Sequence, residues 1–126
     1  MVGAELRLQA LHERYHASLP NKRASVDLAW CAYRADRLDP ERQESLMRLV
    51  HRLAGSAPSY GYGEIGEIAA KADVLMEQFR QTDTPEPVGH AGLDGLDPLI
   101  ALLLQALDQA AASPARTHEA IADAQS

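Results

Sequence analysis

Cysteine is nearly absent from this chain, with Cys31 the single instance in 126 residues. An internal disulfide and a metal site built from several thiolates are therefore excluded. A lone cysteine is more often a small buried apolar residue than a nucleophile, so we expect Cys31 to lie in the core. This usage favours a protein of the reducing cytoplasm.

Long apolar runs and aromatic side chains are also scarce. No stretch approaches the roughly 18 apolar residues that a membrane-spanning helix needs. The N-terminal residues 1–16 carry too many charges for a secretory signal, so we expect no membrane segment. Only 5% of the residues are aromatic although 46% are hydrophobic. The core is therefore predicted to be aliphatic and rich in alanine.

Basic residues are the minority: 12 lysines and arginines stand against 18 aspartates and glutamates, for a formal net charge of −6. A negatively charged protein is poorly suited to electrostatic capture of nucleic acid or of an anionic membrane. We therefore expect neither of these as a partner.

The apolar residues recur at helical spacing and show no sustained alternation, which predicts helices almost throughout. The expected helical segments cover residues 4–18, 21–37, 39–57, 64–81 and 93–112, with Asp97-Pro98 as an alternative start for the last segment. Short connections between the last four predict an all-α fold, an antiparallel up-and-down four-helix bundle with an additional short N-terminal helix. We expect residues 1–112 to form this single domain and 113–126 to be a flexible tail.

Local signals mark several boundaries. Asp39 followed by Pro40 predicts an N-cap with proline in the first turn of a helix. In "PSYGYG", Gly61 and Gly63 can take the positive φ that a turn requires. The segment "TDTPEPVGHAG", residues 82–92, is rich in proline and glycine and is predicted to be a loop.

Two helices have apolar stripes that predict their buried faces. In the second helix, the stripe is Ala24, Leu28, Cys31 and Ala35. In the fourth helix, the stripe is Ile65, Ile68, Ala69, Ala72, Leu75, Met76 and Phe79.

The segment "HERYH" matches the zinc-protease pattern H-E-x-x-H. His12 and His16 lie one turn apart on a helix and could bind one metal ion, with Glu13 as a general base. No strong third ligand follows nearby, and nothing in the sequence indicates a substrate cleft. We therefore favour the alternative, a solvated helix face without a metal.

A second histidine lies off the apolar stripe of its helix. At 100° per residue the apolar residues of this helix cluster within about 60° of one direction. They are Leu46, Leu49, Val50, Leu53 and Ala57. His51 projects roughly 140° from Leu46, on a face shared with Glu44 and Arg48. We therefore expect its ring to be exposed.

Gly55 lies one turn beyond His51 and almost in line with it. Glycine inside a helix costs about 1 kcal/mol relative to alanine, but a missing Cβ leaves space beside the imidazole. Arg52 adds a positive charge, Ser56 adds a hydroxyl, and Ala54 keeps the surroundings small. Such a ring suits a group that becomes negatively charged, as on phosphorylation. By geometry alone, a solvated histidine beside an incidental glycine remains an alternative.

The stretch "HRLAGSAPSYG" resembles the signature of histidine-containing phosphotransfer (HPt) domains of bacterial phosphorelays. The matching residues are His51, Arg52, Gly55, Ser56 and Gly61. The "SLP" before the second helix and "GEIGEIAAKADVLME" after the signature also resemble members of this family. The likeness spans residues 15–107.

The resemblance implies a phosphocarrier rather than a classical enzyme. In this family the histidine accepts a phosphoryl group from a sensor histidine kinase or a receiver aspartate and passes it to another receiver aspartate, so His51 is the expected phosphoacceptor. The expected partners are a response-regulator receiver domain and a sensor histidine kinase. The chain itself is expected to be a monomer. Mg²⁺ is expected in the receiver and no cofactor in this chain. The alternative is an HPt-like module that docks on a kinase or receiver without being phosphorylated.

The resemblance also assigns roles around the ring. Gly55 would leave room for the receiver, with Met47 and Ala54 in a small exposed docking patch. Arg52 and Ser56 would support the phosphate.

Two positions depart from the family pattern. Many members have lysine where this chain has Ala54, which leaves Arg48 or Arg52 to supply the missing charge. Many have glutamine or glutamate against the ring nitrogen that is not phosphorylated, and the matching residue here is Asp73. Its shorter carboxylate would orient the ring of His51 and support its positive form.

Overall fold

The computed structural model describes residues 2–80 and 85–115, and for residues 2 and 85–94 the backbone alone. Its helices are α1 (Val2–Ala17), α2 (Leu19–Ala35), α3 (Pro40–Ser56), the 3-10 helix η1 (Ala57–Tyr60), α4 (Gly63–Arg80) and α5 (Pro85–Ala112). No strand occurs in the described residues, so the prediction of an all-helical fold is confirmed. No helix in this part of the chain is long and apolar enough to cross a membrane.

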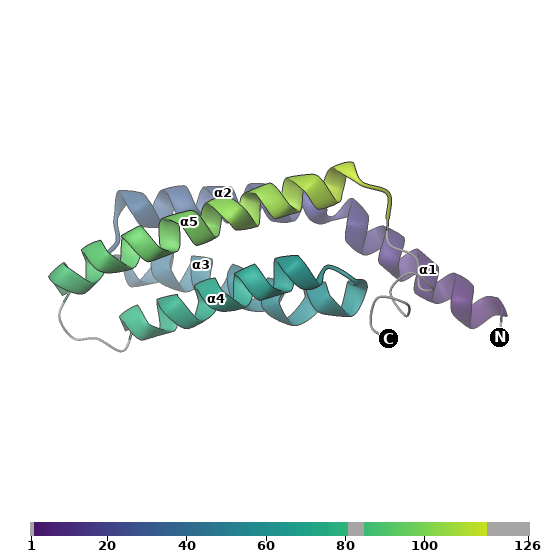
Figure 1. Ribbon diagram of the computed structural model, residues 1–126, viewed down its shortest axis with the longest axis horizontal. Helices are drawn as coiled ribbons and strands as arrows, with labels where there is room; N and C mark the ends of the chain where they lie inside the picture. Colours follow the sequence, from purple (N-terminus) through teal and green to yellow (C-terminus); the bar gives the residue numbers. More distant parts are fainter. Residues whose placement is uncertain (1, 81–84, 116–126) are drawn as a thin grey trace.

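Helices α2 to α5 lie lengthwise beside one another, while α1 projects from one end (Figure 1). The contacts run from α2 to α3, from α3 to α4, from α4 to α5 and from α5 back to α2. The most deeply buried side chains are Leu19, Val26, Leu46, Val50, Met76, Leu96, Ile100, Leu103 and Leu107. Each such side chain stabilises the fold by roughly 1.5–3 kcal/mol. The largely aliphatic core agrees with the composition.

The start and end of α3 follow local signals in the sequence. Asp39 caps the helix, because its side chain accepts a hydrogen bond of 3.0 Å from the backbone N–H of Glu41. At the other end, η1 stops at Gly61, which has a φ of 90°. Only glycine takes this conformation without strain. Gly63 does not use its freedom and instead begins α4.

The predicted buried face of α2 is wrong. Its stripe of Ala24, Leu28, Cys31 and Ala35 is exposed, with Leu28 retaining 73% of its accessible surface and Cys31 a free exposed thiol. The buried residues are instead Leu19, Val26, Trp30 and Tyr33. Burial of two large aromatic rings removes more apolar surface from water than burial of alanines and one leucine, and this decides how the helix is turned.

Helix α5 begins earlier than its sequence predicts. Residues 85–92 are helical, so the predicted loop is wrong over this range, and residues 82–84 lie outside the described part. Pro85 occupies the first helical position, where a missing N–H and a fixed φ are tolerated. Pro98 lies inside the helix and does not begin it. The helix ends at Ala112 as predicted; of the expected tail, residues 116–126 are not described.

The end of α1 is held against the bundle by aromatic rings. Tyr15 stacks on Tyr60 with ring centroids 4.2 Å apart, and the rings of His12 and Tyr60 form a T-shaped pair with centroids 5.5 Å apart. The Tyr15 hydroxyl is hydrogen-bonded to the Ser56 hydroxyl at 2.8 Å. Burial raises the pKa of Tyr15, and the bond to Ser56 offsets part of this rise. These contacts join α1 to the last turn of α3.

The two histidines of "HERYH" have separate partners. His12 is buried against Tyr60, so the prediction of a solvated face is wrong for this residue. The Nε2–H of His16 donates to the carbonyls of Ala110 (3.1 Å) and Ser113 (2.6 Å) at the end of α5. In the described part of the chain, no group of three or more His, Cys, Asp or Glu side chains could hold a metal ion.

Candidate functional site

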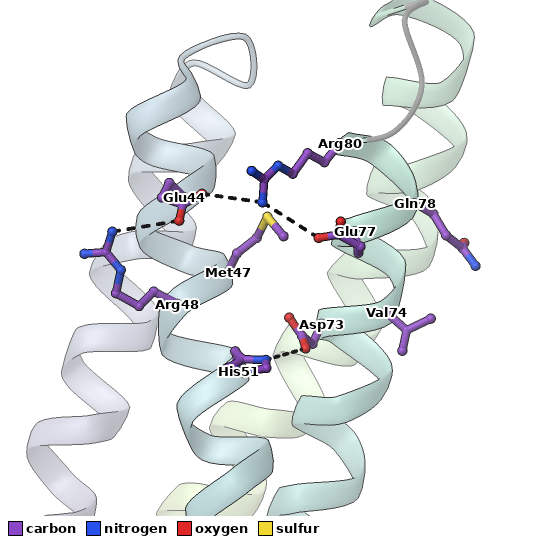
Figure 2. A pocket seen from close by; sticks show the side chains of 9 residues that line it. All are labelled: Glu44, Met47, Arg48, His51, Asp73, Val74, Glu77, Gln78 and Arg80. Atoms are coloured by element: carbon purple, nitrogen blue, oxygen red, sulfur yellow. Dashed lines mark hydrogen bonds and ion pairs between the residues drawn. The ribbon is translucent and has the colours of Figure 1, made fainter.

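His51 lies on the outer face of α3 with 77% of its side chain exposed, as its angle on the helix predicts. Its Nδ1 donates a hydrogen bond of 2.9 Å to Oδ2 of Asp73 on α4 (Figure 2). Asp73 is the only hydrogen-bond partner of the ring among the described residues. A neutral imidazole that donates from Nδ1 carries its lone pair on Nε2. The hydrogen bond at Nδ1 therefore leaves Nε2 as the ring nitrogen with an available lone pair.

A groove of about 610 Å³ runs between α3 and α4 beside this pair (Figure 2). It is lined by Glu44, Met47, Arg48, His51, Asp73, Val74, Glu77, Gln78 and Arg80. The His51–Asp73 hydrogen bond crosses the space between the two helices. Further along, Arg80 lies 4.0 Å from Glu44 on α3 and 3.9 Å from Glu77 on its own helix. Pairs of polar or charged side chains thus link α3 and α4 at two levels of the groove.

Met47 is buried, so the prediction that it belongs to an exposed docking patch is wrong. Its side chain is 7% exposed and packs in the core, although it still lines the groove. On α3, Met47 is turned from His51 toward the α4 side of the helix, where apolar neighbours cover it. Ala54 is half-buried against the same core. The exposed apolar side chain in the groove is instead Val74.

The helix surface next to the ring is open at Gly55. A Cβ added at this glycine would meet no other atom within 4 Å. Gly66 on α4 is different, because a Cβ there would lie 2.5 Å from Cγ of Pro58. Gly66 therefore allows η1 to pack closely on α4, whereas Gly55 leaves space on the outside of the bundle.

The basic and hydroxyl residues proposed for phosphate support divide into two groups. Arg48 lines the groove and lies 3.9 Å from Glu44, a long and exposed ion pair. Arg52 is exposed and makes no ion pair within the described residues. The hydroxyl of Ser56 is turned toward Tyr15 of α1. The structure therefore brings Arg48 and Asp73 to the groove with His51, and leaves Ser56 at the junction with α1.

A family model for the Hpt domain matches residues 8–113, most of the chain. The chain belongs to the Hpt domain family. No curated protein and no solved structure matches it. At the level of the family, Hpt domains carry out histidine phosphotransfer in phosphorelays and interact with kinases and receiver domains.

Several residues around the site of this Hpt domain are missed by sequence reasoning. Val74 and Glu77 could have been found from Asp73, because Val74 is an apolar residue off the buried stripe of α4 and Glu77 lies one turn from Asp73. Arg80 follows three residues after Glu77, which also places it on this face of the helix.

Proposed function

We propose that this Hpt domain relays a phosphoryl group through Nε2 of His51, between a histidine kinase or receiver aspartate and another receiver aspartate. The observation that carries the proposal is the exposed ring held at Nδ1 by Asp73. The open helix surface at Gly55 gives a partner access to it. The proposal includes a monomer acting in the cytoplasm, with α2 to α5 as an antiparallel up-and-down bundle.

The transfer needs little covalent work from this chain. The lone pair of Nε2 attacks the phosphorus of an aspartyl phosphate, a P–N bond forms, and the P–O bond to the aspartate breaks so that its carboxylate leaves. Nδ1 keeps its proton, and the negative Asp73 stabilises the positive ring that results. The second transfer is the reverse reaction with a different aspartate. Positioning and charge neutralisation dominate such steps, and the receiver supplies Mg²⁺.

Charge on the phosphorylated ring would be met by arginine. Arg48 and Arg52 flank His51 on α3, whereas Ala54 carries no charge. The ion pair of Arg48 with Glu44 is long and exposed, and such pairs contribute little to stability. A phosphoryl group bearing nearly two negative charges would therefore compete well for Arg48.

Docking of the receiver would use small or apolar surface beside the ring. Gly55 supplies clearance, Ala54 keeps the flank low, and exposed Val74 on α4 provides an apolar contact. Met47 would support this patch from beneath, because it is buried.

The test is direct phosphorylation. We expect phosphoramidate, a small phosphoryl donor, to label the wild-type chain with an acid-labile phosphate that a purified receiver domain then removes. Labelling should be lost in His51→Gln and retained in His118→Gln, a matched control at another histidine. Acid-labile label that survives His51→Gln contradicts the proposal. Receiver binding and signalling retained by His51→Ala would instead identify a docking module.

A further inference from the structure

Two cations near the site differ from their neighbours in having no acidic partner. On α3, Arg42 lies 3.2 Å from the carboxylate of Asp39, and Arg48 also has an acidic neighbour. In the described part of the chain, neither Arg52 nor Lys22 of α2 has a carboxylate within 4.0 Å. What sets these two cations apart in a chain with a net charge of −6 is that they lie close enough to repel one another.

Contacts with α1 connect these two cations. The Lys22 ammonium donates to the Ser18 hydroxyl at 2.6 Å and lies 4.5 Å above the ring of Tyr15. The Tyr15 hydroxyl is bonded to Ser56, which lies one turn after Arg52 on α3. We call Lys22, Tyr15, Ser56 and Arg52 the Lys22–Arg52 cluster. An ammonium has three donors, so Lys22 can still bind an anion while it keeps its bond to Ser18.

The two positive charges repel one another in the free protein. Burial lowers the pKa of Lys22, and the charge of Arg52 lowers it further. Partial burial also weakens the screening of this repulsion by solvent. A carboxylate placed between them would be attracted to both charges and would remove the repulsion. The cluster is therefore suited to an acidic ligand.

The cluster lies beside the phosphoacceptor on the side opposite Asp73. At 100° per residue on α3, Gly55 lies about 40° from His51 and Arg52 about 100°, in the same direction around the helix. The open surface at Gly55 therefore lies between the ring and the cluster. A partner that covers Gly55 and reaches Nε2 from solvent also comes within reach of both cations.

We propose that Lys22 and Arg52 bind carboxylate side chains on the receiver domain that exchanges phosphate with His51, and so orient it on the α2 side of the ring. This inference rests on the proposed function. The five N–H donors of Arg52 allow it to bind such a carboxylate and also to face the phosphate. Complementary charges at the edge of an interface act mainly on the association rate and on its salt dependence. Lys22 thus acts as a specificity-determining residue for the receiver.

The test uses Lys22→Glu, with Lys71→Glu as its control because Lys71 is exposed on α4 and carries the same charge. The full chain is labelled with phosphoramidate and mixed with a panel of purified receiver domains, of which the fastest acceptor becomes the probe. We expect kcat/KM for transfer from Lys22→Glu to fall about tenfold at low salt. Transfer from Lys71→Glu should stay within about twofold of wild type, as expected for a surface charge outside the contact. The neutral variant Lys22→Gln should be intermediate, and the wild-type rate should fall more steeply with salt than the Lys22→Glu rate.

The outcomes separate the two proposals. Labelling by phosphoramidate involves no receiver domain, so it should be equal in Lys22→Glu, Lys22→Gln and wild type. This equality also shows that the variants are folded at the site. A wild-type chain that is not labelled at His51 contradicts the proposed function. Normal labelling with equal transfer from Lys22→Glu and Lys71→Glu leaves that function standing and overturns the role of the cluster.

Discussion

Gly55 offers the sharpest prediction, because its replacement should make the protein more stable and less active. A Cβ at this position meets no atom within 4 Å, so Gly55→Ala introduces no clash. Alanine inside a helix is favoured over glycine by about 1 kcal/mol. For a chain of this size the melting temperature should therefore rise by about 3–6 °C. A scan of ellipticity against temperature measures this shift.

The effect on transfer should have the opposite sign and grow with side-chain size. If the receiver packs over Gly55, a bulky side chain there costs about 1–3 kcal/mol of interface packing. Since 1.4 kcal/mol is a factor of ten, Gly55→Leu should lose about fivefold to a hundredfold in kcat/KM for transfer to a receiver. Gly55→Ala should lose less.

Phosphoramidate provides the internal control for this variant. The donor is far smaller than a receiver, so Gly55→Leu should still be labelled at the wild-type rate. Slow labelling would mean that the substitution disturbs His51 itself. A Gly55→Leu protein that exchanges phosphate with the receiver as fast as wild type would refute the idea that the open helix surface is a docking space.

Two further substitutions test the site and the packing beneath it. Asp73→Asn keeps an oxygen that can accept the hydrogen bond from Nδ1 of His51 but removes the negative charge. Phosphoramidate labelling should therefore slow about fivefold to tenfold, as expected when a charged hydrogen-bond acceptor becomes neutral. An unchanged labelling rate would mean that the carboxylate only orients the ring. In Gly66→Ala the added methyl overlaps the proline ring of η1, which should cost about 1–3 kcal/mol, while the helix preference of alanine offsets about 1 kcal/mol of this. Urea denaturation measures the net change, and a gain of about 1 kcal/mol in stability would show that η1 moves aside at no cost.

The sequence predicts α3 and α4 well because their apolar residues are large and regularly spaced. Such patterns leave one favourable way to turn each helix toward the core. In α2 the alanines, Leu28 and Cys31 form an equally regular but smaller stripe, and burial of Trp30 and Tyr33 outweighs it. The prediction of a loop over residues 85–92 is wrong for a different reason. The proline and glycine content of this segment suggests a loop, but proline at the first helical position is compatible with a helix.

The candidate site is predictable where it depends on a single helix. The exposure of His51 and the space at Gly55 both follow from angles on α3. Asp73 could be named only through the resemblance to the family, because nothing local says which residue of α4 faces His51. The position of Lys22 near the site could not be predicted from the sequence at all. Its position depends on the packing of α2 and α1 against α3, which burial of aromatic residues determines.

The two departures from the family pattern, Ala54 and Asp73, are consistent with one another when the positions of the charged side chains around His51 are compared. Position 54 lies about 60° from His51 on the α4 side of the helix, the side on which Asp73 accepts the hydrogen bond from Nδ1. A lysine there would compete with the ring for that carboxylate. With Ala54 in its place, Asp73 is left to the imidazole, and the cations Arg48 and Arg52 lie on the other side of the ring. In the phosphorylated state that we propose, the carboxylate that supports the ring and the arginines that meet the phosphate would therefore lie on opposite sides of His51.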